Sequence, residues 1–316
     1  MRPDAPGGSV ADAVPDNWVD RRAPAWTRPY LRLSRADRPA GTWLLLIPCW
    51  WGLGLAVAAD WRGPTAFDLW IALGCAIGAF LMRGAGCTWN DLTDREIDAK
   101  VARTRSRPLP SGQVTPRAAA AWMVLQALLA CAILLTFPPT AIWLGVASLG
   151  LVAIYPFAKR FTWWPQVFLG LAFNWGILLA WAAHDDGLDR AVLPLYLAGV
   201  AWTLFYDTIY AHQDREDDAL IGVKSTARLF GTRSRAWLAG FAAAAVVLAA
   251  LSVWMAVHWP LDLWLGLAGV AAFGLHLAWQ LLRLDIDDPA RCLMLFRANR
   301  DAGLLLALGL ALAAWK

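Results

Sequence analysis

Charged residues are scarce in this 316-residue chain, at 16% of the total, and histidine occurs only four times. Hydrophobic residues make up 59%, whereas globular domains average roughly 45–50% apolar and about 25% charged residues. A single soluble core cannot bury that surplus, because cores stop growing as chains lengthen. The high apolar content also excludes a disordered chain. The net charge of +4 is not gathered into a basic domain, so no nucleic-acid partner is expected.

Cysteine is also sparse, and its five copies form no C-x-x-C pair. An odd number without paired spacing excludes a disulfide framework and a cysteine metal site. We therefore interpret these residues as small buried hydrophobes. They are Cys49, Cys75, Cys87, Cys131 and Cys292.

The first residues lack the apolar run that a secretory signal requires. They also carry acids such as Asp4 and Asp12, which mitochondrial presequences avoid. We predict a disordered cytosolic tail over residues 1–27, followed by a membrane domain over residues 28–316.

Long apolar segments fill the rest of the chain, and about 20 residues suffice for a helix to cross a bilayer. Hydrocarbon offers no partner for a free backbone amide, so such segments must be helical. The sequence therefore predicts an all-α, polytopic membrane protein with nine transmembrane helices. The expected spans are 40–59, 67–89, 117–136, 139–157, 163–183, 191–211, 236–257, 261–282 and 296–315.

Lysine and arginine are distributed unevenly between alternate loops. Nearly all lie before the first span or after the second, fourth, sixth and eighth, whereas the other side holds only Arg62, Arg190 and Lys316. Positively charged loops remain in the cytoplasm. We therefore predict a multi-pass protein of the bacterial inner (plasma) membrane, with a cytoplasmic amino terminus and an external carboxyl terminus.

A first cluster of carboxylates follows the second span. If that helix continues past the membrane edge, Asp91, Asp94 and Asp98 stack on one face, because they are three and four residues apart. Stacked like charges repel one another, so a cation is expected there. Magnesium takes oxygen ligands and often shares carboxylates with substrate phosphates. The arginine-rich stretch 103–107 could bind the same phosphates.

A second cluster follows the sixth span, where Asp207, Asp214 and Asp218 share a helical face with Tyr210. The seven-residue spacing of Asp207 and Asp214 repeats a spacing of the first cluster. One acidic cluster alone is more often a solvated surface. Two clusters on the same side of the membrane suit two magnesium ions that hold a diphosphate between them, since paired metals stabilise a departing oxyanion.

Four motifs in chain order carry a resemblance to a known family. The chain resembles the UbiA superfamily of intramembrane prenyltransferases, and within it the bacterial 4-hydroxybenzoate polyprenyltransferases, over about residues 28–315. The motifs are residues 35–39, residues 90–98 with 107–112, residues 155–160, and residues 206–218 with 224–226.

This resemblance implies nine helices around a central cavity with a cytoplasmic cap. It also implies that magnesium bridges a polyprenyl diphosphate in the membrane. The expected reaction moves the polyprenyl group to the ring carbon ortho to the hydroxyl of 4-hydroxybenzoate, as in ubiquinone biosynthesis. No obligatory protein partner is implied.

The resemblance also implies a role for each matching residue. Asp207, Asp91 and Asp94 are the expected catalytic residues, with Asp207 assisting proton loss. Asn174 departs from the pattern, because a smaller residue is expected there. The expected magnesium ligands are Asn90, Asp91, Asp94, Asp98, Asp214 and Asp218, with Asp217 as an alternative to Asp218. The expected substrate-binding residues are Arg103, Arg107 and Lys224 for the diphosphate, Arg160 with Lys159 for the acceptor carboxylate, and Tyr155 and Tyr210.

Two alternatives remain open from the sequence. One is a different aromatic acceptor, such as dihydroxynaphthoate, homogentisate, haem or a chlorophyllide. The other is an ion-coupled transporter, although transporters place ionisable groups near the bilayer midplane. Here the acids lie at helix ends and Arg83 is the notable charge inside a span. Prenyl chain length and oligomeric state have no sequence signal.

Overall fold

The computed structural model describes residues 13–14, 16–99, 104–215, 222 and 224–315. Every regular element in these ranges is a helix. The chain divides into two compact units. Unit 1 comprises residues 1–43 and 76–134, and unit 2 comprises residues 44–75 and 135–316. We describe each unit separately.

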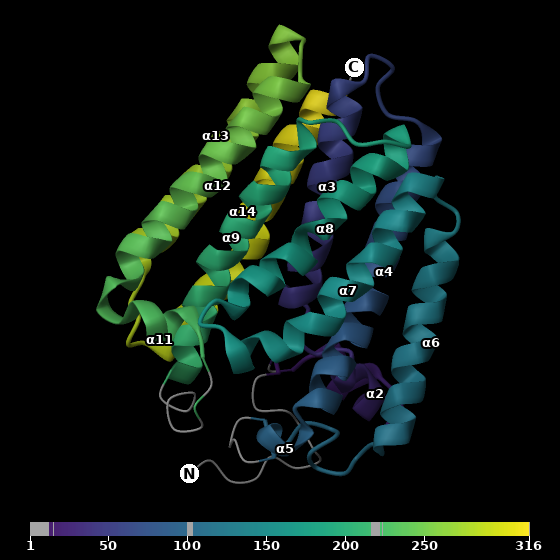
Figure 1. The fold of residues 1–316 in the computed structure, drawn as a ribbon, viewed down its shortest axis with the longest axis vertical. Coiled ribbons are helices and arrows are strands. Elements are labelled where there is room, and N and C mark those ends of the chain that lie inside the picture. Colours follow the sequence, from purple (N-terminus) through teal and green to yellow (C-terminus); the bar gives the residue numbers. More distant parts are fainter. Residues whose placement is uncertain (1–12, 15, 100–103, 216–221, 223, 316) are drawn as a thin grey trace. The chain divides into compact units, whose positions relative to one another are not determined.

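Each of the nine expected spans coincides with a long helix (Figure 1). Five of these helices begin with proline, whose missing N–H and fixed φ suit the first helical turn. The nine are α3 (Ala40–Ala59), α4 (Ala66–Thr93), α6 (Pro116–Leu134), α7 (Pro139–Phe161), α8 (Pro165–Asp185), α9 (Val192–Ala211), α12 (Ser234–Ala256), α13 (Pro260–Arg283) and α14 (Pro289–Ala314).

Eight helices in the described ranges are long and apolar enough to cross a membrane. The ninth expected span lies in α14, whose apolar half is preceded by Arg297, Arg300 and Asp301 within the same helix. α14 starts seven residues earlier than predicted. Asp288 caps it by accepting hydrogen bonds from the amides of Ala290 and Arg291, so the charged segment joins the helix.

Order begins before the predicted start of the membrane domain. A short helix α1 (Trp18–Arg22) is capped by Asn17, and its Val19 is fully buried. Val19 packs with Ala23 and Ala36, which lie on either side of α2 (Arg28–Leu33). The expectation of a disordered tail over residues 1–27 is therefore wrong for its last part. α1 contributes only Trp18 and Val19 as apolar residues, too few to produce a periodic apolar pattern in the sequence.

Unit 2 is a bundle in which α9 is the most enclosed helix. α9 packs against α8, α12 and α14, while α13 pairs with α12 and α14 (Figure 1). Trp202 of α9 lies 4.8 Å from Trp51 of α3 and 5.9 Å from Phe273 of α13, measured between ring centroids. All three rings are fully buried. This aromatic core fixes α9, the helix that carries Asp207.

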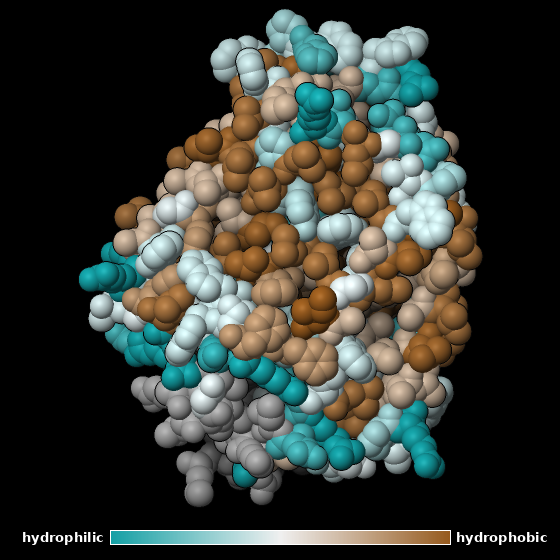
Figure 2. All heavy atoms as spheres, in the orientation of Figure 1, coloured by the Kyte–Doolittle hydropathy of each residue, from teal (hydrophilic) through white to brown (hydrophobic). Residues whose placement is uncertain are grey.

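The outer surface of the helices is apolar, as a lipid environment requires. Figure 2 shows hydrophobic side chains over the middle of the visible face and hydrophilic ones gathered toward its two ends. Large exposed residues include Leu128, Trp143, Val247 and Leu275. Soluble proteins rarely expose so extensive an apolar surface to water, whereas a lipid bilayer favours it.

In unit 1, a small hydrophobic cluster gathers segments that are distant in sequence. Leu33 at the end of α2 packs with Leu109, Val114 and Ala119, and Leu92 of α4 lies against them. Trp122 of α6 also donates a hydrogen bond to the Ser34 hydroxyl. This cluster places the end of α2 and the 107–114 segment beside the last turn of α4.

Candidate functional site

The first acidic cluster lies where α4 ends. The backbone bonds from Asp94 N to Asn90 O and from Asp98 N to Asp94 O, of 2.9 and 2.8 Å, continue the helical pattern. The helix nevertheless breaks at Asp94 and resumes as α5 (Arg95–Asp98). The side chains of Asp91 and Asp94 are fully buried and that of Asp98 is nearly so. The predicted single helix is therefore interrupted, although the acids stay together.

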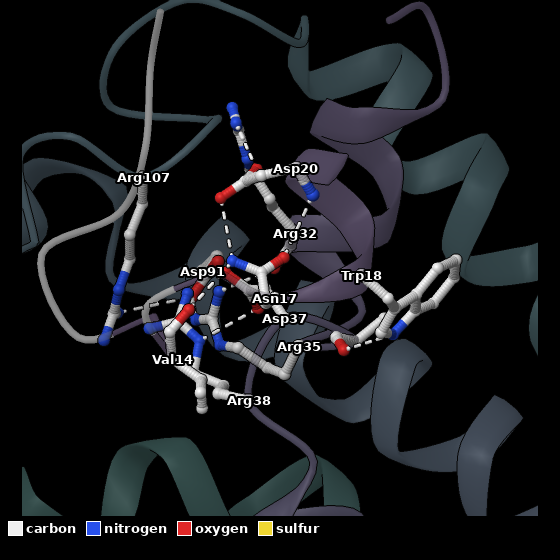
Figure 3. A network of polar contacts seen from close by, with 11 residues as sticks. Val14, Asn17, Trp18, Asp20, Arg32, Arg35, Asp37, Arg38, Asp91 and Arg107 are labelled. Atoms are coloured by element: carbon white, nitrogen blue, oxygen red, sulfur yellow. Dashed lines mark hydrogen bonds and ion pairs between the residues drawn. The ribbon is translucent and has the colours of Figure 1, made fainter. Parts of the chain in front are cut away.

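Two arginines supply the cation that the stacked carboxylates require. Arg35 Nη2 lies 2.5 Å from Asp91 Oδ1, and Arg107 Nη1 lies 3.4 Å from the same oxygen (Figure 3). Arg107 Nη1 also lies 2.8 Å from Asp98 Oδ2. Both arginines come from segments held by the Leu33 cluster. Buried carboxylates need such partners, because an unpaired buried charge is very costly.

Sequence reasoning missed Arg35, although the residue belongs to the first of the four family motifs. Its contact with Asp91 joins residues 56 apart in the chain. Apart from that motif, the signal was the cluster of arginines before the first span, which we assigned to membrane orientation.

Further ion pairs surround this network at the amino-terminal side. Arg32 pairs with Asp20 at 2.8 Å, and the indole of Trp18 donates to the Ala36 carbonyl (Figure 3). Burial raises the pKa of Asp37 to about 6, although the charge of Arg35 opposes this rise. These contacts tie the segment before α3 to the turn that presents Arg35.

The first acidic cluster still offers an unused ligand atom. Asp91 Oδ2 is buried and has no hydrogen-bond partner. Burial raises the pKa of Asp98, Arg107 opposes the rise, and the charges of Asp91 and Asp94 add to it. In the described ranges, no three His, Cys, Asp or Glu side chains converge closely enough to form a metal site. Arg107 bridges two of the carboxylates, Asp91 and Asp98.

The second acidic cluster begins on the last turns of α9. The Asp207 side chain is half-buried. The neighbouring rings of Tyr206 and Tyr210 pack on Phe296 of α14, with centroids 5.9 and 4.5 Å apart. Asp214 closes the 3-10 turn η1 (His212–Asp214), and its side chain lies outside the described part. Asp217, Asp218 and Arg103 also lie outside the described residues.

Two basic segments meet at the end of α7. The Lys224 amide donates to the Lys159 carbonyl, and Lys224 Nζ donates to the Phe161 carbonyl, both at 3.4 Å. Lys224 and Arg228 also lie near the Trp163 ring, 6.0 and 5.4 Å from its centroid. The structure therefore gathers predicted substrate-binding residues that are about 65 positions apart in the chain.

Two further residues predicted to bind substrate, Tyr155 and Arg160, lie on α7 with Lys159. Arg160 stacks over Phe157, with Cζ 5.1 Å from the ring centroid. Tyr155 lies one turn before Lys159 on α7. The segment after the second acidic cluster is anchored by α11 (Thr226–Phe230), since the hydroxyls of Thr208 and Thr226 are 2.6 Å apart.

Asn174, which departs from the family pattern, has a specific place in unit 2. Its Nδ2 donates to the Gly170 carbonyl and to Thr203 Oγ1, both at 2.8 Å, and Thr203 donates to the Tyr206 hydroxyl. The side chain fits because residue 199 is glycine: a Cβ there would lie 2.2 Å from Asn174 Oδ1. The larger residue is thus accommodated by a glycine on the facing helix.

Replacing Asn174 by leucine should destabilise unit 2 by about 1–3 kcal/mol, because Thr203 loses its buried donor. Thermal unfolding of the detergent-solubilised protein measures this loss. The double variant with Thr203→Val removes both polar partners and should recover part of the stability. Equal stability of wild type and Asn174→Leu would show that the hydrogen-bond chain contributes nothing.

Two solved structures resemble the fold of this chain. A UbiA homologue from Archaeoglobus fulgidus, bound to GPP and Mg2+, superposes with a TM-score of 0.66 at 20% identity. The match covers 90% of this chain and 99% of that one. A UbiA homologue from Aeropyrum pernix K1 in its apo form gives 0.65 at 24% identity, over 85% of this chain and 97% of that one. The TM-scores show a shared fold.

Curated relatives are much closer in sequence. The mouse protein named mitochondrial 4-hydroxybenzoate polyprenyltransferase is 50% identical over 93% of this chain and 77% of its own length. Proteins of the same name from Arabidopsis thaliana and human are 47% and 46% identical. They match 94% and 93% of this chain, and 71% and 78% of their own lengths.

These relatives correct the predicted location. The bacterial inner membrane is wrong on this comparison, because the relatives are named as mitochondrial proteins. The amino terminus was assigned to the cytoplasm for a bacterial inner membrane, so this assignment is wrong for the same reason. The charge asymmetry between loops reports which ends share a side, but it does not identify the membrane.

The model of the UbiA prenyltransferase family matches residues 45–314, which include nearly all of the long helices and both acidic clusters. Together with the resemblance in sequence and fold, this match shows that the chain belongs to the UbiA prenyltransferase family and is a membrane-embedded transferase.

Proposed function

We propose that this protein transfers a polyprenyl group from polyprenyl diphosphate to the ring carbon ortho to the hydroxyl of 4-hydroxybenzoate, with release of diphosphate. One observation carries the proposal: relatives named for this activity are 46–50% identical over more than nine tenths of the chain. Membership of a prenyltransferase family removes the support for an ion-coupled transporter.

The acidic residues fit a magnesium cofactor by their chemistry. Carboxylate and amide oxygens are the ligands that magnesium prefers, and Asp91 Oδ2 is a buried oxygen with no hydrogen-bond partner. Asn90, Asp91, Asp94 and Asp98 would hold one ion, and Asp214 and Asp218 a second. When bound, magnesium supplies positive charge that stabilises the diphosphate as a leaving group.

The remaining roles fall to the chain's own basic and acidic groups. Arg107, Arg103 and Lys224 would bind diphosphate oxygens, so that the allylic C–O bond breaks with both electrons leaving on oxygen. Arg160, assisted by Lys159, would hold the acceptor carboxylate, while Tyr155 and Tyr210 would contact the substrates. The ring carbon then forms the new C–C bond, and Asp207 would take the displaced ring proton.

The membrane setting favours this reaction. An allylic cation is captured by water unless water is excluded, and the apolar helices provide that exclusion. Charge on the leaving diphosphate is stabilised by preorganised groups, which usually contribute the largest catalytic effect. The central cavity that would hold the polyprenyl chain remains a prediction from the family resemblance.

The test uses purified protein, 4-hydroxybenzoate, one polyprenyl diphosphate and magnesium, with mass spectrometry of the products. We expect a product with the acceptor mass plus the polyprenyl group minus one hydrogen, and release of diphosphate. Chelation by EDTA should abolish the product and excess magnesium should restore it. Preferred prenylation of dihydroxynaphthoate or homogentisate in the same assay would contradict the proposed acceptor.

A further inference from the structure

Arg35 adopts a backbone conformation that arginine rarely takes. Its φ of 58° lies in the left-handed region, which costs a side-chain-bearing residue roughly 1–2 kcal/mol. The turn at the end of α2 holds it there through hydrogen bonds from Arg35 N to Arg32 O and from Ala36 N to Leu31 O. Strain of this kind persists where the surrounding structure enforces it, often at functional sites.

The strained turn aims the guanidinium at one carboxylate oxygen. Arg35 is almost completely buried, and Nη1 donates to the Arg32 carbonyl while Nη2 binds Asp91 Oδ1. The other oxygen, Asp91 Oδ2, is buried without a hydrogen-bond partner. Half of this carboxylate is therefore satisfied by arginine and half is available to another group.

We propose that Arg35 is a positioning residue that stands in for a divalent cation at Asp91 while the site is empty, and that competes with this cation when it binds. The inference rests on the proposed function, because it takes Asp91 as a metal ligand. Arg35, in the turn after α2, and Arg107, in the 107–114 segment, both contact the same oxygen of Asp91.

The net charge of the acidic cluster determines how strongly it binds a metal ion. The cluster of three buried carboxylates, Asp91, Asp94 and Asp98, contains two cations, because Arg35 pairs with Asp91 and Arg107 pairs with Asp91 and Asp98. Little net negative charge therefore remains for a free divalent ion. A diphosphate brings its own negative charges and offsets the repulsion between the arginines and the metal. Arg35 therefore weakens the binding of metal alone and favours the arrival of metal together with diphosphate.

The test measures metal binding without any substrate. Mn2+ is the probe, and the free ion is followed by electron paramagnetic resonance with purified protein. The key variant is Arg35→Asn, because asparagine tolerates a positive φ better than most residues. Arg35→Gly is the second variant, because glycine fits this φ without strain and keeps the test available if the first fails to fold.

We expect both variants to bind Mn2+ about tenfold more tightly than wild type, since one opposite charge near a carboxylate shifts its affinity for a cation by roughly one to three decades. Arg35→Lys keeps a cation and should stay close to wild type. Without metal, Arg35→Asn should unfold at a lower temperature, and Mn2+ should raise that temperature more than in wild type. If Arg35 had only a structural role, its replacement would not tighten the binding of Mn2+.

Arg32→Gln is the matched control. Arg32 lies in α2, three residues before Arg35, and is equally buried, but it pairs with Asp20. Its loss should lower stability and leave the affinity for Mn2+ unchanged. Unchanged or weaker Mn2+ binding in Arg35→Asn and Arg35→Gly would overturn the proposed competition.

Asp91→Asn separates this inference from the proposed function. If it binds Mn2+ as well as wild type does, Asp91 is not a metal ligand and the proposed metal site fails. If it loses Mn2+ while the Arg35 variants match wild type, the metal site stands and only the competition fails.

Discussion

Replacing Asp91 by asparagine should reduce prenyl transfer at least about a hundredfold to a thousandfold, the loss expected when one preorganised electrostatic group is removed. The change preserves shape but removes the charge that Arg35 and Arg107 contact. It also removes a carboxylate ligand of the proposed magnesium ion. Product formation is measured by mass spectrometry under saturating substrate and magnesium.

Loss of folding could imitate loss of catalysis in this variant. Removing one partner of a buried ion pair costs about 3–5 kcal/mol, because the other charge is left uncompensated. The double variant Asp91→Asn with Arg35→Asn removes both charges, so it should recover stability while remaining inactive. Recovery of activity in the double variant would show that Asp91 serves only to balance Arg35.

Asp20→Asn is the matched control for this experiment. Asp20 is also an aspartate of unit 1 that pairs with a buried arginine, Arg32, at 2.8 Å. It has no proposed contact with metal or substrate, so its loss should alter stability modestly and leave transfer close to wild type. Full transfer by a folded Asp91→Asn protein would remove Asp91 from the catalytic residues.

The helices were predictable because lipid imposes a simple rule on sequence. A span must be apolar for about 20 residues and must satisfy its own backbone, so composition alone locates it. α3 begins and ends at the predicted residues, and most other ends differ by a few positions. α14 differs most, because a capped charged segment extends the helix without adding apolar residues.

The grouping of Asp91, Asp94 and Asp98 was predictable for a different reason, namely that charges are costly near a bilayer and their spacing is informative. The roles of these carboxylates stay predictions. Their electrostatic partners were not predictable. Arg35 reaches Asp91 because a left-handed turn and the Leu33 cluster bring it there, and neither feature has a local sequence signature. In the same way, Asn174 is explained by Gly199 on a facing helix. Such pairings depend on tertiary packing.

Replacing Gly309 by valine should destabilise the protein by about 3 kcal/mol or more, at or beyond the upper end for overpacked sites. A Cβ on Gly309 would lie 2.4 Å from the Gly269 Cα, and a Cβ on Gly269 would lie 2.7 Å from the Gly309 Cα. α13 and α14 therefore meet backbone to backbone. Small residues permit such close approach, which drives helix association where lipid removes the hydrophobic effect.

The effect should be large because backbone atoms cannot rotate away from the new methyl groups, unlike the end of a flexible side chain. α14 would have to move from α13, and the separation would also disturb the contact between Gly303 and Trp202 of α9. Unfolding temperature in detergent measures the loss. Gly240→Val on α12 is the matched control, because no atom lies within 4 Å of its added Cβ. If both valine variants unfolded at the same temperature, the close glycine contact between α13 and α14 would not contribute to the stability of the protein.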